Sequence, residues 1–179
     1  MNLLAITTAL MLFLHPQAHE TAAHAGEGGE APNEAISIIN TEGQTIGQAV
    51  LTQKGDKVVI HLEAEKLTPG KHGIHIHQFG KCEAPDFKSA GDHFNPQGKQ
   101  HGFNNPKGFH EGDLPNIEVD ANGKVAIDIT TAVVTLQPGH PNSIVKADGA
   151  SLIIHEKADD YVTDPSGNSG ARIACGVIK

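Results

Sequence analysis

KHGIHIHQFGKCEAPDFKSAGDHFNPQGKQHGFNNPKGFHEGD, the stretch from Lys71 to Asp113, holds six of the twelve histidines of this chain. Gly, Pro and Asn separate many of these histidines, and such residues are typical of turns and loops. Histidine is also the commonest metal ligand in proteins, because its neutral ring offers a nitrogen lone pair. The stretch therefore predicts a short strand that leads into loops folded around metal.

The spacing at the start of the stretch points to one metal. His75 and His77 alternate with Ile74 and Ile76. Side chains two residues apart share one face of a strand, so both imidazoles project together and both isoleucines face the other way. His155, at the end of a downstream apolar run, could join this pair. Three or four imidazoles in a flattened arrangement suit copper.

A second set of ligands follows Cys82 in the loop-like part of the stretch. Three histidines and one aspartate suit the tetrahedral nitrogen and carboxylate coordination of zinc: His93, His101, His110 and Asp113. The alternative for any single histidine is a surface position without metal. That alternative leaves the set as a whole unexplained.

The composition favours one all-β domain. The chain has 179 residues, no Trp, one Tyr and 20 Gly, which indicates short strands and many turns. The formal net charge of −8 argues against nucleic acid or an anionic membrane as a partner. An anionic substrate would therefore need a local positive feature to reach its site.

The amino-terminal segment resembles a secretory signal. Leu3–Leu14 is an unbroken run of mostly apolar residues, too short to span a bilayer and suited to the core of a signal peptide. Ala23-His24-Ala25 has the small-x-small pattern of a cleavage site, and Pro16-Gln17-Ala18 offers an earlier cut. No Lys or Arg precedes the run, and no Cys follows it to carry a lipid anchor.

These features divide the chain into three parts. We predict a signal peptide at 1–25, a flexible leader at 26–34 and one domain at 35–179. The protein is then exported to the periplasm, the cell envelope or the medium, with no membrane anchor after cleavage. Within the first part, His15, His19 and His24 could bind metal only if they are retained.

The two cysteines, Cys82 and Cys175, leave two readings open. In an exported protein they would pair and tie the metal loop to the carboxyl-terminal strand. In a cytosolic protein they would be two free, buried thiols.

Short β-branched runs separated by turn signals predict eight strands, and Asn122-Gly123 is a strong hairpin signal. The predicted strands are 35–40, 45–52, 57–65, 73–77, 114–119, 124–130, 151–155 and 172–179. We expect an eight-stranded antiparallel Greek-key β-barrel or sandwich in which two long loops form the metal site.

Five motifs are spread from Gly73 to Ile178: GIHIHQFGKC, SAGDHFNP, HEGDLPNI, IIHEKADD and GNSGARIACGVI. In these motifs the chain resembles the Cu,Zn superoxide dismutases. The resemblance implies disproportionation of superoxide to oxygen and hydrogen peroxide, with copper and zinc as cofactors and the superoxide anion as substrate.

The resemblance also implies a role for each matching residue. The copper ligands are His75, His77, His93 and His155. The zinc ligands are His93, His101, His110 and Asp113, so that His93 bridges the two metals. His93 also takes up and returns a proton, and Arg172 docks the superoxide anion beside copper.

Other matching positions support the site. Asp159 matches a carboxylate that links a copper-ligand histidine with a zinc-ligand histidine, and such an outer partner fixes the tautomer and orientation of a ring. His72 matches a histidine that packs near the site without binding metal. Cys82 and Cys175 match the family disulfide.

Three features leave alternatives open. The loop after Asp160, YVTDPSGNSG, is short and lacks Lys, which leaves Lys157 and Arg172 to guide the anion. The contacts of a homodimer cannot be carried over, because members of the family pair through different surfaces. A copper- and zinc-binding protein without turnover would use the same ligands, although it would need no arginine beside the metal.

Overall fold

The computed structural model describes residues 33–179. The predicted signal peptide, with His15, His19 and His24, and residues 26–32 of the predicted leader lie outside the described residues. Within 33–179, no helix combines the length and the apolar character that crossing a membrane requires. The regular structure there is almost entirely β, which confirms the predicted fold class.

Nine strands and one three-residue 3-10 helix, η1 (Lys88–Ala90), are formed in this part of the chain. The strands are β1 (Asn33–Asn40), β2 (Thr45–Lys54), β3 (Lys57–Ala64), β4 (Gly70–His72), β5 (Ile74–His77), β6 (Ile117–Val119), β7 (Val125–Thr131), β8 (Ala150–His155) and β9 (Arg172–Ile178). β1 begins two residues before the predicted start of the domain at residue 35.

The ninth strand arises because the chain changes partners at Gly73. β4, which lies outside the predicted strands, pairs with β6, whereas β5 pairs with β8. Between them, Gly73 donates its N–H to Lys157 O and accepts the N–H of His155. A Cβ at Gly73 would lie 3.0 Å from the Cβ of Ser169, so glycine permits this close approach.

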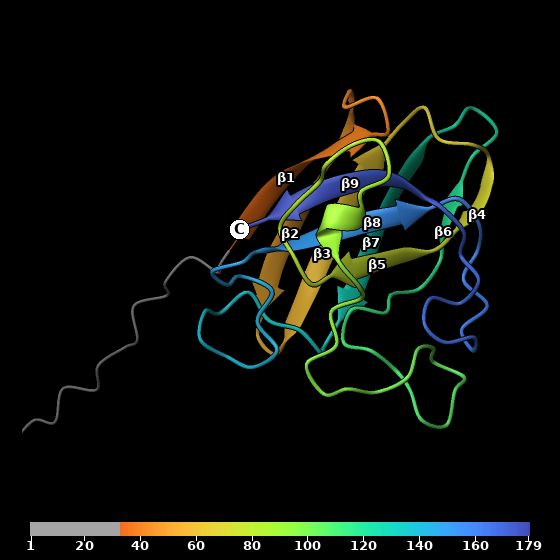
Figure 1. The fold of residues 1–179 in the computed structure, drawn as a ribbon. Coiled ribbons are helices and arrows are strands. Elements are labelled where there is room, and N and C mark those ends of the chain that lie inside the picture. Colours follow the sequence, from red (N-terminus) through yellow and green to blue (C-terminus); the bar gives the residue numbers. More distant parts are fainter. Residues whose placement is uncertain (1–32) are drawn as a thin grey trace, which may run out of the picture.

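Seven strands form one antiparallel sheet in the order β5-β8-β9-β1-β2-β3-β7, and β4-β6 form a small second sheet. Figure 1 shows the large sheet curled, with β5, β8 and β9 drawn in front of β2, β3 and β7. The order places β9, the last strand, beside β1, the first. Such non-sequential neighbours agree with the predicted Greek-key arrangement.

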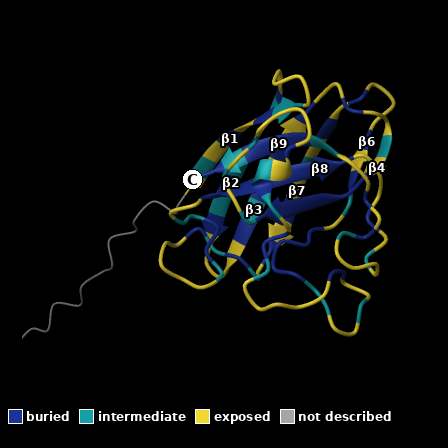
Figure 2. Ribbon diagram, viewed as in Figure 1, coloured by how far each residue is buried: buried dark blue, intermediate teal, exposed yellow. Residues whose placement is uncertain are grey.

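One core joins the two ends of the curled sheet. Ile76 and Leu152 from β5 and β8 belong to the same buried cluster as Leu51, Ile60 and Ile129 from β2, β3 and β7. These side chains are at most 4% exposed, and Figure 2 shows the buried residues gathered along the strands. Burial of this apolar surface is the main force that holds the sheet in its curled form.

The long loop 78–116 covers the outer face of β8 and β9. Phe87 and Ala90 pack there against Ile153 and Cys175 in a second buried cluster, and Figure 1 shows η1 over these strands. A disulfide joins Cys82 to Cys175 across a Cα–Cα distance of 5.7 Å, which confirms the predicted pairing. The loop that carries most of the predicted ligands is therefore fastened to the sheet.

Candidate metal centre

The alternation in β5 separates the core from the site. Ile74 and Ile76 lie in the main core, whereas His75 and His77 project to the opposite face, beneath the loop 78–116. All four side chains are buried. The burial of imidazoles on a strand face that could have been apolar already indicates a polar site under the loop.

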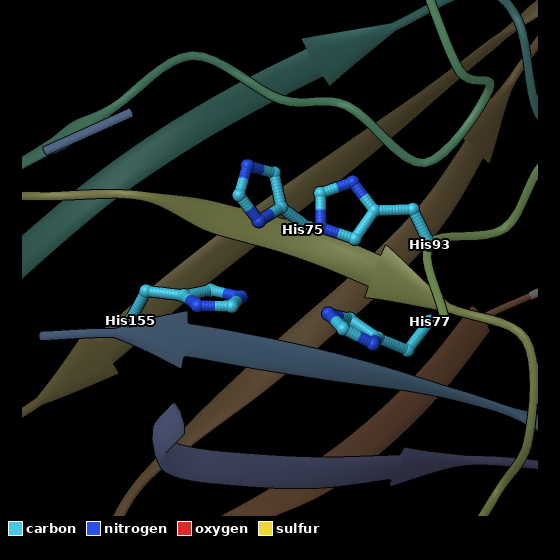
Figure 3. A group of neighbouring side chains, drawn as sticks. All are labelled: His75, His77, His93 and His155. Carbon is cyan, nitrogen blue, oxygen red and sulfur yellow. The ribbon is translucent and has the colours of Figure 1, made fainter. Parts of the chain in front are cut away.

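Two further histidines reach the same place from distant parts of the chain. His93 follows η1 and forms an isolated antiparallel bridge with His77. His155 ends β8, where the register with β9 shifts between Ile154 and His155. Figure 3 shows the four rings, His75 among them, around a shared space. One ring nitrogen from each of the four lies within 4.8 Å of the others.

Three of these rings are oriented by an acceptor on the side away from the shared space. His77 donates from Nδ1 to Gly91 O at 2.9 Å, and His155 donates from Nδ1 to Gly170 O at 3.2 Å. His75 directs Nε2 to Asp159 Oδ2 at 2.8 Å. Because these oxygens only accept, the nitrogen that faces each one carries the hydrogen, and the other nitrogen of a neutral ring keeps its lone pair.

The nitrogens that face the shared space are buried and have no hydrogen-bond partner: His75 Nδ1, His77 Nε2, His93 Nε2 and His155 Nε2. An unpartnered buried nitrogen costs free energy unless a ligand satisfies it. Four imidazole nitrogens directed at one point fit a transition metal such as copper.

The second group gathers around one carboxylate. Asp113 Oδ1 lies 2.9 Å from His93 Nδ1, 2.9 Å from His101 Nδ1 and 3.3 Å from His110 Nδ1. The Nδ1 atoms of His93 and His110 are themselves 3.4 Å apart. His93 thus presents one nitrogen to each group. Three nitrogens and a carboxylate oxygen suit zinc.

Proximity alone also groups His75 with His93, His101 and Asp113. The hydrogen bonds decide between His75 and His110 as the fourth member. Nε2 of His75 hydrogen-bonds to Asp159, and Nδ1 of His75 is one of the four unpartnered nitrogens of the first group. His110 Nδ1 instead lies beside Asp113 and His93.

Asp159 connects the two groups from behind. It accepts from His75 Nε2 through Oδ2, and its Oδ1 lies 3.0 Å from His101 Nε2. The backbone N–H of Tyr161 also donates to Oδ1, at 2.6 Å. Both imidazoles therefore direct Nε2 toward Asp159 and Nδ1 away from it.

Burial sets the protonation of these rings in the metal-free protein. Burial, and to a lesser extent charge repulsion from His75, lowers the pKa of His93 and of His155 to about 3. Burial also opposes the charge of His101, but hydrogen bonds to Asp113 and Asp159 outweigh it and raise that pKa to about 9. The first group thus offers neutral nitrogens, and the second is already polarised by carboxylates.

Arg172 is half-buried on the wall of a cavity that His77, His93 and His155 also line. Its guanidinium donates from Nη1 to Phe87 O at 2.8 Å and from Nη2 to Gly91 O at 2.6 Å. The Gly91 carbonyl therefore accepts from both His77 and Arg172. This shared acceptor fixes the position of the cation relative to the histidine group.

His72 is buried but stands apart from both groups. Its Nδ1 lies 2.7 Å from His155 O and its Nε2 lies 2.8 Å from Thr68 O. Both ring nitrogens of His72 are therefore engaged by backbone carbonyls outside the two groups.

Sequence reasoning missed two residues that support the site. Asn116, inside the HEGDLPNI motif, hydrogen-bonds to the backbone of Asp159. Asp164 accepts the backbone N–H of His101 at 2.6 Å, and its Oδ1 lies 3.9 Å from His110 Nε2. Their proximity in sequence to assigned residues was a signal, but only the fold shows what they contact.

The chain is similar to known proteins. Residues 45–178 match the family model described as copper/zinc superoxide dismutase (SODC). Superoxide dismutase (Cu-Zn) 1 of Aquifex aeolicus is 50% identical over 143 residues, 79% of this chain and 85% of that protein. Superoxide dismutase (Cu-Zn) of Caulobacter vibrioides is 40% identical over 148 residues, 81% of this chain and 85% of that protein.

A solved structure has a similar fold. The crystal structure of a superoxide dismutase-like protein from Bacillus subtilis is 47% identical to this chain, with a TM-score of 0.79. The match covers 81% of this chain and 97% of that one.

Proposed function

The chain belongs to the copper/zinc superoxide dismutase family, and from this premise we propose how its own residues carry the disproportionation of superoxide. The observation that carries the proposal is the set of four buried, unpartnered imidazole nitrogens that face one space. Burial of these polar nitrogens without a partner costs free energy. In a protein that binds copper and zinc, a bound metal would provide the partner.

The two groups divide the metals between them. His75, His77, His93 and His155 would hold copper, and His93, His101, His110 and Asp113 would hold zinc. Copper, when bound, supplies one-electron redox chemistry, and zinc supplies a fixed positive charge without redox chemistry. The orientation of His75 and His101 by Asp159 supports this division, because an outer carboxylate of this kind raises the basicity of a ligand.

Arg172 would dock the substrate. Two superoxide anions and two protons give one oxygen and one hydrogen peroxide, so an anion must approach the centre in each half of the reaction. The guanidinium is planar, remains cationic and lies on the cavity wall with two of its nitrogens fixed by carbonyls. Its free donors can receive the anion beside the histidine group.

His93 would supply one of the protons. Its Nε2 faces the cavity and has no partner in the protein, whereas Nδ1 lies beside Asp113. A proton held at Nε2 is therefore placed next to the position where the second superoxide becomes peroxide. Catalysis would then rest on His93 and Arg172 together with the metals.

The test is superoxide decay measured with the copper- and zinc-loaded protein. His155→Ala removes one nitrogen of the first group and leaves the second group complete, so we expect loss of more than about 100-fold in rate, with zinc retained. His140→Ala, which changes an exposed histidine in another loop, is the matched control. Full metal binding without catalysed decay would instead favour a metal-binding protein without turnover.

Export belongs to the same proposal. The Cys82–Cys175 disulfide supports an oxidising compartment, and the apolar run Leu3–Leu14 supports a cleaved signal. Cell fractionation and amino-terminal sequencing of the isolated protein test the predicted boundary at residue 25. A homodimer is the last part of the proposal, with no surface assigned to it, and light scattering on the purified protein measures it.

A further inference from the structure

The cavity above the histidine group carries more positive charge than the sequence led us to expect. Its wall includes Lys99 and Lys146 as well as Arg172, and the acids on the same wall are Asp92 and Asp164. The wall therefore has one more cation than acid before any metal is counted, in a chain whose formal net charge is −8. Lys157, expected to guide the anion, is absent from this lining.

The side chain of Lys146 is held in place by two contacts on this wall. Its ammonium donates to the carbonyl of Gln78, the residue after His77, at 2.7 Å. It also lies 5.9 Å from the centre of the Phe79 ring. A lysine fixed by a carbonyl and an aromatic face loses little further side-chain entropy when an anion arrives.

The charge of Lys146 is not cancelled locally. Among residues 33–179, Lys88 and Lys124 lie within 4.0 Å of carboxylates, at Asp86 and Glu65, but neither Lys146 nor Arg172 does. Both cations are held by neutral carbonyl oxygens instead. No ion pair within residues 33–179 neutralises either cation, so the positive electrostatic potentials of both add in the cavity.

The loop that carries Lys146 does not depend on this hydrogen bond. Gly80 donates its N–H to Asp148 O at 2.8 Å, and Ser151 Oγ donates to Phe79 O at 2.8 Å. These bonds join the same two segments without the ammonium group. A purely structural role for Lys146 would thus duplicate contacts that already exist.

We propose that Lys146 is an anion-guiding residue, a second cation that draws superoxide into the cavity toward Arg172 and the histidine group. The inference deepens the proposed function and rests on it. Lys146 would guide the anion in place of the short loop after Asp160, because that loop has no Lys.

The experiment compares four forms of the metal-loaded full chain: wild type, Lys146→Gln, Lys146→Arg and Lys54→Gln. Lys54 is exposed at the end of β2, outside this cavity, and its variant changes the net charge by the same amount as Lys146→Gln. Two quantities are measured for each form. One is the dissociation constant of azide, a small monovalent anion, from its optical band with copper(II). The other is kcat/KM for superoxide against ionic strength.

We expect Lys146→Gln to weaken azide binding and to lower kcat/KM at low salt by about twofold to fourfold each, with a shallower dependence on ionic strength. Lys146→Arg and Lys54→Gln should stay close to wild type. The proposal is overturned if Lys146→Gln matches Lys54→Gln in both measurements, or if Lys146→Arg is as impaired as Lys146→Gln. If the wild type binds azide but does not consume superoxide, the proposed function fails, and azide binding still tests the role of Lys146 separately.

Discussion

Asn116 and Asp159 hydrogen-bond to each other twice, although 43 residues separate them. The backbone N–H of Asp159 donates to Asn116 Oδ1 at 2.8 Å, and Asn116 Nδ2 donates to the backbone carbonyl of Asp159 at 2.9 Å. The pair fixes the backbone whose carboxylate orients His75 and His101. The orientation of these two rings therefore depends in part on Asn116, which forms no hydrogen bond to either ring.

Replacement of Asn116 by Ala should loosen Asp159. We expect the free energy of unfolding to fall by about 1–3 kcal/mol, since both hydrogen bonds are lost, and metal affinity to fall with it. Asn142→Ala is the control, because Asn142 donates a similar hydrogen bond to Val133 O in another loop. It should lose stability but keep metal affinity. Equal metal affinities in the two variants would show that Asn116 has no part in positioning the site.

Asp159→Asn should act on the metals directly. An amide offers one oxygen as acceptor where the carboxylate serves both His75 and His101, so one ring loses its orienting partner. We expect affinity for at least one metal to fall by about 10- to 100-fold, with the fold retained. Competition with a chelator measures it, and Asp128→Asn, at an exposed carboxylate that contacts His61, controls for the loss of charge. Unchanged affinities would contradict the orienting role.

Removal of the disulfide should impair both stability and catalysis. The double variant Cys82→Ser, Cys175→Ser opens a loop closed across a sequence separation of 93, worth about 4–5 kcal/mol in the chain-entropy model. The same loop supplies the carbonyls of Phe87 and Gly91 that hold Arg172. We therefore expect kcat/KM to fall even at temperatures where the metal-loaded variant stays folded. A fully active variant would mean that packing alone positions Arg172.

The metal-free protein should be most stable near pH 6.5. His93 and His155 have a pKa of about 3 when folded and an ordinary value of about 6.5 when unfolded, so the unfolded chain binds more protons as the pH falls through this range. Each group then lowers the free energy of unfolding by up to about 1.4 kcal/mol per pH unit.

His101 produces the alkaline side of the same curve. Its folded pKa of about 9 gives stability that is complete below about pH 6.5 and is lost as the pH rises toward 9. Urea unfolding of the metal-free protein at pH 4.5, 6.5 and 8.5 measures both effects. Greater stability at pH 4.5 than at pH 6.5 would refute the pKa shifts of His93 and His155.

Local patterns in the sequence were enough to predict much of this protein. The alternation of His75 and His77 with isoleucines predicted a strand with a polar face, because side-chain direction on a strand has a period of two residues. Turn residues located most of the strands. The five motifs indicated the family, and the cysteines paired as the resemblance implied.

Contacts between distant segments were decided only by the tertiary structure. Four features have no periodic pattern in the sequence. They are the change of strand partners at Gly73, the hydrogen bonds between Asn116 and Asp159, the shared carbonyl of Gly91 and the position of Lys146 on the cavity wall. Each depends on where the curled sheet and its covering loops bring segments together. The sequence by itself was enough to predict the candidate donor set and eight of the nine strands in residues 33–179, because these follow from residue type and local spacing. Only the fold decided which nitrogen faces the site and which cation faces the cavity, since those depend on packing across the whole domain.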